Sequence, residues 1–313
     1  MVVWLLPANA AADKKCLLVM SYHTGYAWND GIELEVERVL TGHCVLKKFF
    51  MDTKRNTSVA YAKNKAQQVK QLIAQFKPDV VIATDDNAAK YVVTQYKNAD
   101  LPFVFAGINW TAAAYGFPYK NVTGMVEVGP IIPLLKIIKK TVKNVRSGVY
   151  ISADVITERK DYVRYRKVYQ ARGVRLTAKF VKNMHDWEVA YNHAQKADFI
   201  IVNNYAGIND WDTERAIKIV TEKSKKFTVS YYKFMMPYVM FSITKSAKEQ
   251  GRWAAEVALA VLSGTAVSDI PITINKEWHM FANVKLLQKA KISLDTNTKR
   301  RTSTKWESRA ESR

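Results

Sequence analysis

The sequence predicts an α/β fold of two lobes, each built on a doubly wound parallel sheet. Short strands that are apolar at consecutive positions alternate with amphipathic helices from Lys15 to about Leu262. Such strands are typical of parallel sheets covered by helices on both faces. The chain has 313 residues, about twice the length of an ordinary domain. The β-α units also repeat along it, which favours two similar lobes over one large sheet.

Each half of the chain contains four predicted strands. Between them, apolar residues recur every three or four positions, as from Val59 to Phe76, which predicts a helix that ends before Pro78. The last predicted helix, 246–263, precedes Gly264, a residue typical of helix C-termini. The predicted strands are 16–20, 44–51, 79–84 and 101–106 in the first half, and 147–152, 175–181, 198–202 and 227–231 in the second.

Internal similarity marks the two halves. Residues 78–87 resemble residues 197–205, since both have an Asp, an apolar strand and then polar side chains. Residues 110–121 contain Gly116 and Pro118 and are interpreted as the first crossing between the lobes. The first lobe is therefore expected to begin with 13–110 and the second with 121–244.

The two ends of the chain have unusual compositions. Residues 2–6 are apolar and 7–12 are mostly small, so residues 1–12 are interpreted as the remnant of a secretory signal peptide without its basic front end. The alternative is a frayed apolar N-terminus. Residues 295–313 lack an apolar face and are expected to form a disordered basic tail.

Composition excludes several classes of protein. The net charge is +20, but the lysines are spread over helix faces rather than clustered with aromatics, so nucleic-acid binding is not expected. No run of about 18 apolar residues is present to span a bilayer. Cys16 and Cys44 begin strands that could be neighbours, which leaves a disulfide and two buried thiols as alternatives.

Enzyme motifs are absent from the sequence. It has no glycine-rich phosphate loop, no GxSxG elbow and no HExxH motif, and His185 and His193 have no carboxylate at a metal-ligand offset. We therefore expect no catalytic residue, no metal and no cofactor.

Polar and aromatic residues follow most of the predicted strands. Ligands of open α/β sheets bind at the carboxyl ends of the strands, so these residues are the candidate binding site. Two alternatives remain, in which Asp86 and Asn87 cap the following helix and Tyr22 and Tyr231 only pad the lobe interface. The candidates are Ser21, Tyr22, His23, Tyr26, Trp28, Asp85, Asp86, Asn87, Asn109 and Trp110 in the first half, and Asp154, Asn204, Tyr205, Tyr231 and Tyr232 in the second.

Five phrases of the sequence resemble one family. They are SYHTGYAWNDGI at 21–32, PDVVIATDDNAAKY at 78–91, LPFVFAGIN at 101–109, NVTGMVE at 121–127, and EQGRWAAEVALAVLSGT at 249–265 followed by DIPI. Together they resemble the substrate-binding proteins of ABC-type uptake systems with the type I periplasmic-binding fold. The similar branch includes tryptophan-binding-type proteins and the ectodomains of some membrane sensors.

The resemblance implies two lobes joined by three hinge strands. It implies that 246–267 returns to the first lobe and 270–294 to the second, and that Asp85, Asp86 and Asn87 approach the ligand. The expected function is capture of a small organic molecule, an amino acid or an aromatic or amine compound, by an exported periplasmic monomer. The expected partner is an ABC permease, and the alternative is a sensing module with a separate membrane signalling partner.

Overall fold

Residues 14–304 of the computed structural model form two α/β units. The first contains 14–128 and 246–277, and the second contains 129–245 and 278–304. The chain therefore passes from one unit to the other at three places along the sequence. Residues 1–13 and 305–313 lie outside the described part, and with them the interpreted signal-peptide remnant and the end of the expected tail.

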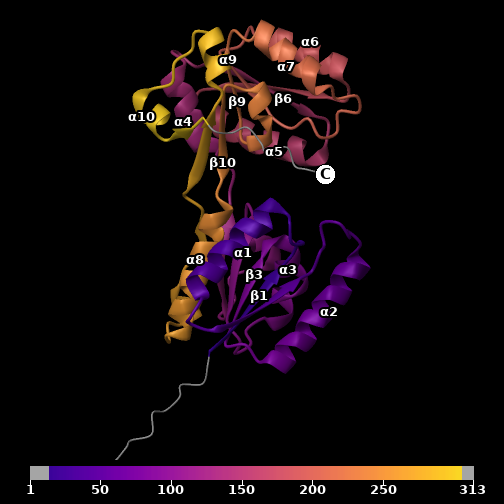
Figure 1. The fold of residues 1–313 in the computed structure, drawn as a ribbon, viewed down its shortest axis with the longest axis vertical. Coiled ribbons are helices and arrows are strands. Elements are labelled where there is room, and N and C mark those ends of the chain that lie inside the picture. Colours follow the sequence, from indigo (N-terminus) through magenta and orange to yellow (C-terminus); the bar gives the residue numbers. More distant parts are fainter. Residues whose placement is uncertain (1–13, 305–313) are drawn as a thin grey trace, which may run out of the picture. The chain divides into compact units, whose positions relative to one another are not determined.

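The first unit contains a parallel sheet of six strands (Figure 1). Helices α1 (Ala27–Leu40) and α8 (Ala247–Leu262) pack against one of its two apolar cores, and α2 (Val59–Phe76) and α3 (Asp85–Tyr91) against the other. In spatial order the strands are β11 (Thr273–Ile274), β5 (Val122–Glu127), β4 (Phe103–Asn109), β3 (Val80–Thr84), β1 (Lys15–Met20) and β2 (Val45–Phe50).

Pairing of β5 corrects the predicted lobe boundaries. Strand β5 pairs in parallel with β4, and β11 pairs with β5. The assignment of 121–128 and 270–277 to the second lobe, and of 110–121 to a crossing, is therefore wrong. Helix α8 does return to the first unit, where it lies beside α1.

Close contact between α1 and α8 requires glycine. A Cβ on Gly251 of α8 would lie 2.3 Å from the carbonyl oxygen of Ile32 in α1. A Cβ on Gly31 would lie 2.9 Å from Cβ of Ala247. The two helices therefore meet at nearly backbone-to-backbone distance and hold the discontinuous segment in the first unit.

The structure also selects between the two cysteine alternatives. Cys16 on β1 and Cys44, just before β2, are joined by a disulfide, with their Cα atoms 6.0 Å apart. The bond links two neighbouring strands at the start of their pairing.

The second unit contains a seven-stranded sheet. The helices of this unit are α4 (Ile131–Thr141), α5 (Ile156–Gln170), α6 (Met184–Ala194), α7 (Thr213–Lys223), α9 (Val284–Lys289) and α10 (Thr296–Arg300). All pairs are parallel except β10 with β12, which are antiparallel. In spatial order the strands are β13 (Thr302–Ser303), β12 (Trp278–Ala282), β10 (Phe241–Lys245), β9 (Phe227–Ser230), β8 (Phe199–Val202), β6 (Ser147–Ala153) and β7 (Arg175–Val181). The short 3-10 helices are η1 (Val93–Tyr96), η2 (Ala112–Tyr115) and η4 (Val267–Asp269) in the first unit and η3 (Lys233–Tyr238) in the second.

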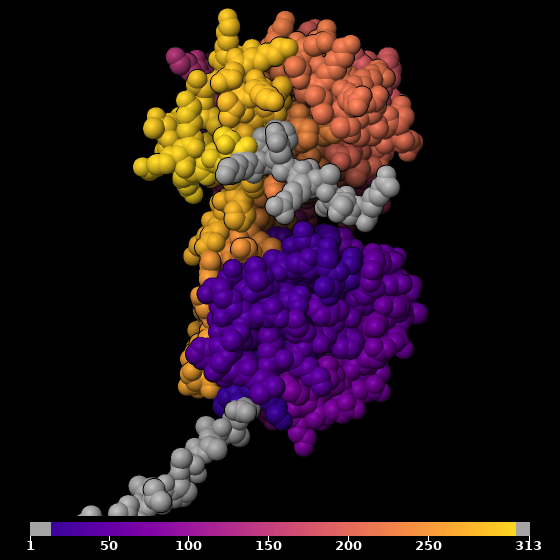
Figure 2. Space-filling view, viewed as in Figure 1, coloured from indigo at the N-terminus to yellow at the C-terminus, as the bar shows by residue number. Residues whose placement is uncertain are grey.

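The expectation of a disordered tail from residue 295 is wrong for residues 295–304. Asp295 caps α10 by accepting a hydrogen bond from the amide of Thr298 at 3.1 Å. Thr298 is buried, and β13 pairs in parallel with β12. The yellow atoms of this C-terminal segment form part of the surface of the second unit in Figure 2. The sequence lacks a long apolar face here, but a capped turn and one strand pair suffice to order it.

We therefore expect truncation after Leu294 to destabilise the protein, whereas truncation after Thr304 is the matched control. Loss of α10 and β13 exposes Leu294 and leaves the edge of β12 unpaired. The shorter chain should melt several degrees lower, corresponding to about 1–2 kcal/mol of unfolding free energy. Equal melting temperatures for the two truncated chains would show that this segment contributes no stability.

Candidate functional site

Aromatic and acidic side chains gather at the carboxyl edge of the first sheet. They follow the ends of β1 and β3 or come from the start of α1 and from η2. We call this group the first-unit cluster, which consists of Tyr22, Tyr26, Trp28, Asp85, Asp86 and Tyr115.

Asp85 is the most unusual member of this cluster. It is only 2% exposed and has a left-handed backbone conformation with φ of 65°. Its Oδ1 accepts a hydrogen bond from Nε1 of Trp28 at 3.0 Å, whereas its Oδ2 is buried without a hydrogen-bond partner. Burial, with a smaller contribution from the charge of Asp86, raises the pKa of the Asp85 carboxyl to about 7.

A glycine on the neighbouring strand leaves space for this carboxylate. Gly107 of β4 has φ of 75°, and a Cβ at that position would lie 3.0 Å from Oδ1 of Asp85. Its amide donates a hydrogen bond to Oε1 of Gln250 in α8. Any larger residue would therefore be strained by its own backbone and would crowd the Asp85 carboxylate.

In Asp86, by contrast, both carboxylate oxygens accept hydrogen bonds. Its Oδ1 accepts from the hydroxyl of Tyr115 at 2.7 Å, and its Oδ2 accepts from Nδ2 of Asn109 at 2.6 Å. Asn87 donates to Oγ1 of Thr53 at 2.8 Å. Thr84 occupies the N-cap position of α3, so the alternative that Asp86 and Asn87 are helix caps is wrong.

The rings of Tyr22 and Tyr26 meet edge to face, with centroids 5.5 Å apart. Nζ of Lys54 lies 4.9 Å from the Tyr22 ring centroid and 4.4 Å from that of Tyr26, so this ring pair already accommodates an ammonium group. Burial and the charges of Asp85 and Asp86 raise the pKa of the Tyr22 hydroxyl, which stays protonated. His23 lies beside Asp52, with Nδ1 3.4 Å from Oδ1.

Two other predicted residues have different surroundings. Ser21 is fully buried, and its hydroxyl donates to the carbonyl of Thr84 and accepts from the amide of Ala88. It positions the start of α3 rather than facing a ligand. Trp110 is half-buried and has φ of 65°, and its amide donates to the carbonyl of Glu127.

The second sheet has its own group of buried polar residues at the carboxyl edge, and its centre is Glu158. This carboxylate on the first turn of α5 is fully buried. Its Oε2 accepts hydrogen bonds from the hydroxyls of Tyr150 at 2.7 Å and Ser152 at 3.0 Å, and from Nδ2 of Asn203 at 2.5 Å. We define the second-unit cluster as Tyr150, Ser152, Glu158, Asp161, Asn203, Tyr231 and Tyr232.

A second carboxylate, Asp161, lies next to Glu158. Its Oδ2 accepts from the hydroxyl of Tyr231 at 3.1 Å, and its Oδ1 pairs with Arg164. Burial and the nearby charge of Glu158 raise the pKa of Asp161. The hydroxyl of Tyr231 also lies 2.9 Å from that of Tyr150, while the ring of Tyr231 stacks on that of Tyr165.

Predicted residues of the second unit also form contacts at the border of this cluster. Tyr232 stacks on Phe234 with centroids 5.0 Å apart, and Tyr205 stacks on Trp211 at 4.7 Å. The side-chain oxygen Oδ1 of Asn204 accepts a hydrogen bond from the amide of Ala206.

Asp154 takes no part in the second-unit cluster. It is salt-bridged to Arg159 at 2.6 Å, which lowers the pKa of the Asp154 carboxyl.

Sequence reasoning missed Glu158 and Asp161. It considered only residues directly after the strands, whereas Glu158 follows the end of β6 by five positions. An acidic residue in the first turn of the next helix was the available signal, because that turn also borders the carboxyl edge.

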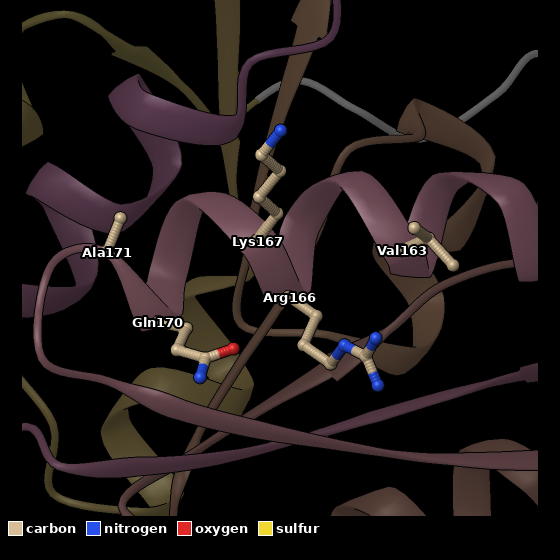
Figure 3. Close-up of a pocket in the computed structure, with 5 residues that line it drawn as sticks. All are labelled: Val163, Arg166, Lys167, Gln170 and Ala171. Carbon is tan, nitrogen blue, oxygen red and sulfur yellow. The ribbon is translucent and has the colours of Figure 1, made fainter.

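Two cavities in the second unit lie elsewhere. One of about 440 Å³ on the outside of α5 is lined by Val163, Arg166, Lys167, Gln170 and Ala171, and Figure 3 shows Arg166 and Lys167 extending away from each other. Another, of about 580 Å³, is formed by the C-terminal segment around Leu287 and Ile292. Neither has converging polar groups, as ligand sites have.

Two further observations concern the part of the chain that the structure describes. Over residues 14–304, no group of three or more His, Cys, Asp or Glu side chains is arranged to hold a metal ion. No helix in the same range combines the length and the apolar character that crossing a membrane requires.

Structural comparison identifies the fold. A ligand-free, open substrate binding protein with adhesive properties from Clostridium difficile matches with a TM-score of 0.72 and 16% identity, covering 91% of this chain and 97% of that one. An ABC domain from Streptococcus pneumoniae in complex with L-Trp matches with a TM-score of 0.57 and 17% identity, covering 93% and 99%. At these identities the likeness shows the type I periplasmic-binding fold, which confirms the predicted fold class.

A solute binding protein of an ABC transporter from Rhodopseudomonas palustris, in complex with 3,4-dihydroxybenzoic acid, matches with a TM-score of 0.55 and 12% identity, covering 82% and 83%. Comparison with curated protein sequences gives no match.

The family model for ABC transporter substrate binding proteins matches residues 47–304. This range includes most of both sheets and all of the second-unit cluster. Proteins of this family bind small solutes and are not enzymes, in agreement with the sequence prediction. The chain therefore belongs to the family of ABC transporter substrate binding proteins.

Proposed function

We propose that this protein captures a small organic molecule with a protonated amine and an apolar, preferably aromatic, body for an ABC-type importer. The observation that supports this most is the buried Oδ2 of Asp85, which has no hydrogen-bond partner. An unpartnered buried carboxylate oxygen costs stability, and a ligand that donates a hydrogen bond to it recovers that cost on binding. The acid and the rings beside it suit an ammonium group.

Charge and ring geometry support a cation over a neutral ligand. An ammonium group within about 4 Å of a desolvated carboxylate interacts more strongly than a neutral donor does. Tyr22 and Tyr26 add ring faces that attract cations, as the position of Lys54 shows. With its pKa raised to about 7, the Asp85 carboxyl is partly protonated near neutral pH, and a cation bound beside it favours the ionised form, so that binding releases a proton.

The second unit supplies a group of the same chemistry. Glu158 and Asp161 are acidic, and Tyr231, Tyr232 and Phe234 offer aromatic surface beside them. We propose that groups from both lobes hold the ligand, with closure about the connecting segments and no bond made or broken. L-Trp, found with the S. pneumoniae protein, combines an ammonium group and an aromatic ring.

We further propose that the protein is exported to the periplasm and acts there as a monomer that delivers its ligand to a membrane permease. The apolar and small residues of 1–12 and the family assignment support this location. A sensing role with a separate membrane signalling partner is the alternative, and a permease and an ATPase encoded beside the gene would favour transport.

A thermal-shift screen of matched amines and alcohols tests the ligand class. Tryptamine and tyramine should stabilise the protein, whereas the corresponding alcohols, which keep the ring and lose the charge, should not. An amine at a hundredfold excess over its dissociation constant adds about 2.7 kcal/mol to the free energy of unfolding. Equal stabilisation by amine and alcohol, or stabilisation by aromatic carboxylates alone, would contradict a cation-binding site.

A further inference from the structure

The amino edge of the second sheet is far more basic than that of the first. In a parallel sheet, the segments that lead from a helix into a strand all lie at the amino ends of the strands. In the second unit these segments are 142–146, 171–174, 195–198 and 224–226, which enter β6, β7, β8 and β9. They contain six basic residues and one acidic residue, namely Lys143, Arg146, Arg172, Lys196, Lys225 and Lys226 against Asp198.

The first unit provides a direct comparison. Its corresponding segments, 41–44, 77–79, 97–102 and 116–121, enter β2, β3, β4 and β5. They contain three basic residues, Lys77, Lys97 and Lys120, and two acidic ones, Asp79 and Asp100. The formal charge of these segments is therefore 6 − 1 = +5 in the second unit and 3 − 2 = +1 in the first, where Lys14, just before β1, adds one more positive charge and pairs with Asp79.

Neighbouring elements extend the positive surface. The last turns of the helices that lead into these segments add Lys139 and Lys140 of α4, Lys167 of α5 and Lys223 of α7, with Glu222 the one acid in those turns. The first residue of β7 adds Arg175. The basic edge is thus Lys139, Lys140, Lys143, Arg146, Lys167, Arg172, Arg175, Lys196, Lys223, Lys225 and Lys226, of which all but the half-buried Lys226 are exposed.

Few of these charges have an acidic neighbour: Lys226 interacts electrostatically with Asp198, and Lys140 with Asp295. Within residues 14–304, none of the side chains of the basic edge forms a salt bridge within 4 Å. The carboxylate of Asp198 is occupied by the amides of Arg146 and Ser147, at 2.9 and 2.8 Å, which lowers the pKa of Asp198. Lys139 donates to the carbonyl of Arg172 at 3.0 Å, which links the ends of α4 and α5.

We propose that the basic edge docks the second unit on the surface of an anionic phospholipid bilayer. Four adjacent strands give an edge about 15 Å wide, with long, flexible cationic side chains and no pocket that would select one ligand. A layer of phosphate headgroups is the partner that such a spread of charge fits, and each Lys or Arg near it strengthens binding roughly fivefold.

Nucleic acid is a poorer fit to the same surface. The four segments contain no aromatic side chain on which a base could stack. Docking through the amino edge also leaves the carboxyl edge of the same sheet, with Glu158 and Tyr232, facing away from the bilayer. The proposal does not depend on the ligand class proposed above.

Sedimentation with lipid vesicles tests the proposal on the full chain. Wild type should bind phosphatidylglycerol vesicles at low salt, fail to bind phosphatidylcholine vesicles, and dissociate at about 0.5 M salt, where screening is strong. The variant Lys143→Glu/Lys196→Glu/Lys225→Glu should bind about a hundredfold more weakly. Its control is Lys63→Glu/Lys70→Glu/Lys120→Glu, which changes the net charge equally on exposed positions of the first unit.

Two results would overturn the proposal. One is equal weakening by the two triple variants, which would mean that net charge rather than the basic edge drives binding. The other is binding to single-stranded DNA or heparin with no binding to anionic vesicles. Melting curves of both variants check that a loss of binding does not reflect unfolding.

Discussion

Replacing Asp85 with Asn is expected to make the ligand-free protein more stable at pH 8. The folded-state pKa of Asp85 is about 7, well above the 3.8 of an exposed Asp in the unfolded chain, so the folded form binds a proton that the unfolded chain releases. The stability contributed by that proton is complete below about pH 4 and is lost as the pH rises through 7. Asn cannot ionise, and it tolerates the left-handed backbone at this position. At pH 8 it therefore avoids a cost on the order of 4 kcal/mol.

Urea unfolding of wild type and Asp85→Asn at pH 5 and pH 8 measures this effect. The advantage of the variant should grow between the two values. The matched control is Asp86→Asn, which should be destabilising by about 1–2 kcal/mol because a neutral amide replaces the carboxylate that accepts charge-assisted hydrogen bonds from Asn109 and Tyr115. If wild type is more stable than Asp85→Asn at pH 8, the ionised Asp85 carboxylate must be well solvated or paired.

Replacing Glu158 with Ala is expected to destabilise the second unit by about 3–5 kcal/mol. The side chain accepts hydrogen bonds from Tyr150, Ser152 and Asn203, all of which are buried. Its removal takes a charged acceptor away from three buried donors, which keep only the weaker neutral partners Asn204, Tyr150 and Tyr231, and opens a cavity as well. Glu158→Gln keeps the volume and one carbonyl oxygen, so its cost should be about half as large.

The same unfolding measurements include Glu222→Ala as a control. Glu222 is an exposed residue of α7 in the same unit, and its replacement should change stability by less than about 0.5 kcal/mol. If Glu158→Ala unfolds at the same denaturant concentration as wild type, the second-unit cluster is not the organising centre of this edge.

Strands that helices cover on both faces could be predicted from the sequence, because a run of consecutive apolar residues identifies such a strand whatever segments it pairs with. All of the strands predicted in advance are present, with bounds shifted by at most a few residues. Strands β5 and β10 were missed because Thr, Gly, Ser and Glu interrupt the apolar pattern in Val122–Glu127 and Phe241–Lys245. Their place is decided by pairing with β4 and with β9 and β12, which no local pattern contains.

The candidate site was only partly predictable, for a similar reason. The rule that ligands meet the carboxyl ends of strands led to Asp85, Asp86 and Tyr22, which the structure brings together. It could not distinguish Asp85, whose Oδ2 has no partner, from Asp86, whose two carboxylate oxygens both accept hydrogen bonds, because that difference depends on Tyr115 and Asn109 in η2 and β4. The surroundings of Glu158 likewise include Asn203 and Tyr232, which lie 45 and 74 residues away in the sequence.

Isothermal titration of the best amine from the screen into wild type, Asp85→Asn and Asp86→Asn tests the central claim most directly. At pH 8, Asp85→Asn should lose about 2–5 kcal/mol of binding free energy, at least thirtyfold in affinity, since the ammonium group would face a neutral amide. Asp86→Asn should lose less, because its carboxylate already has protein partners. An unchanged dissociation constant for Asp85→Asn, while its stability at pH 8 rises as expected, would show that the ligand binds elsewhere.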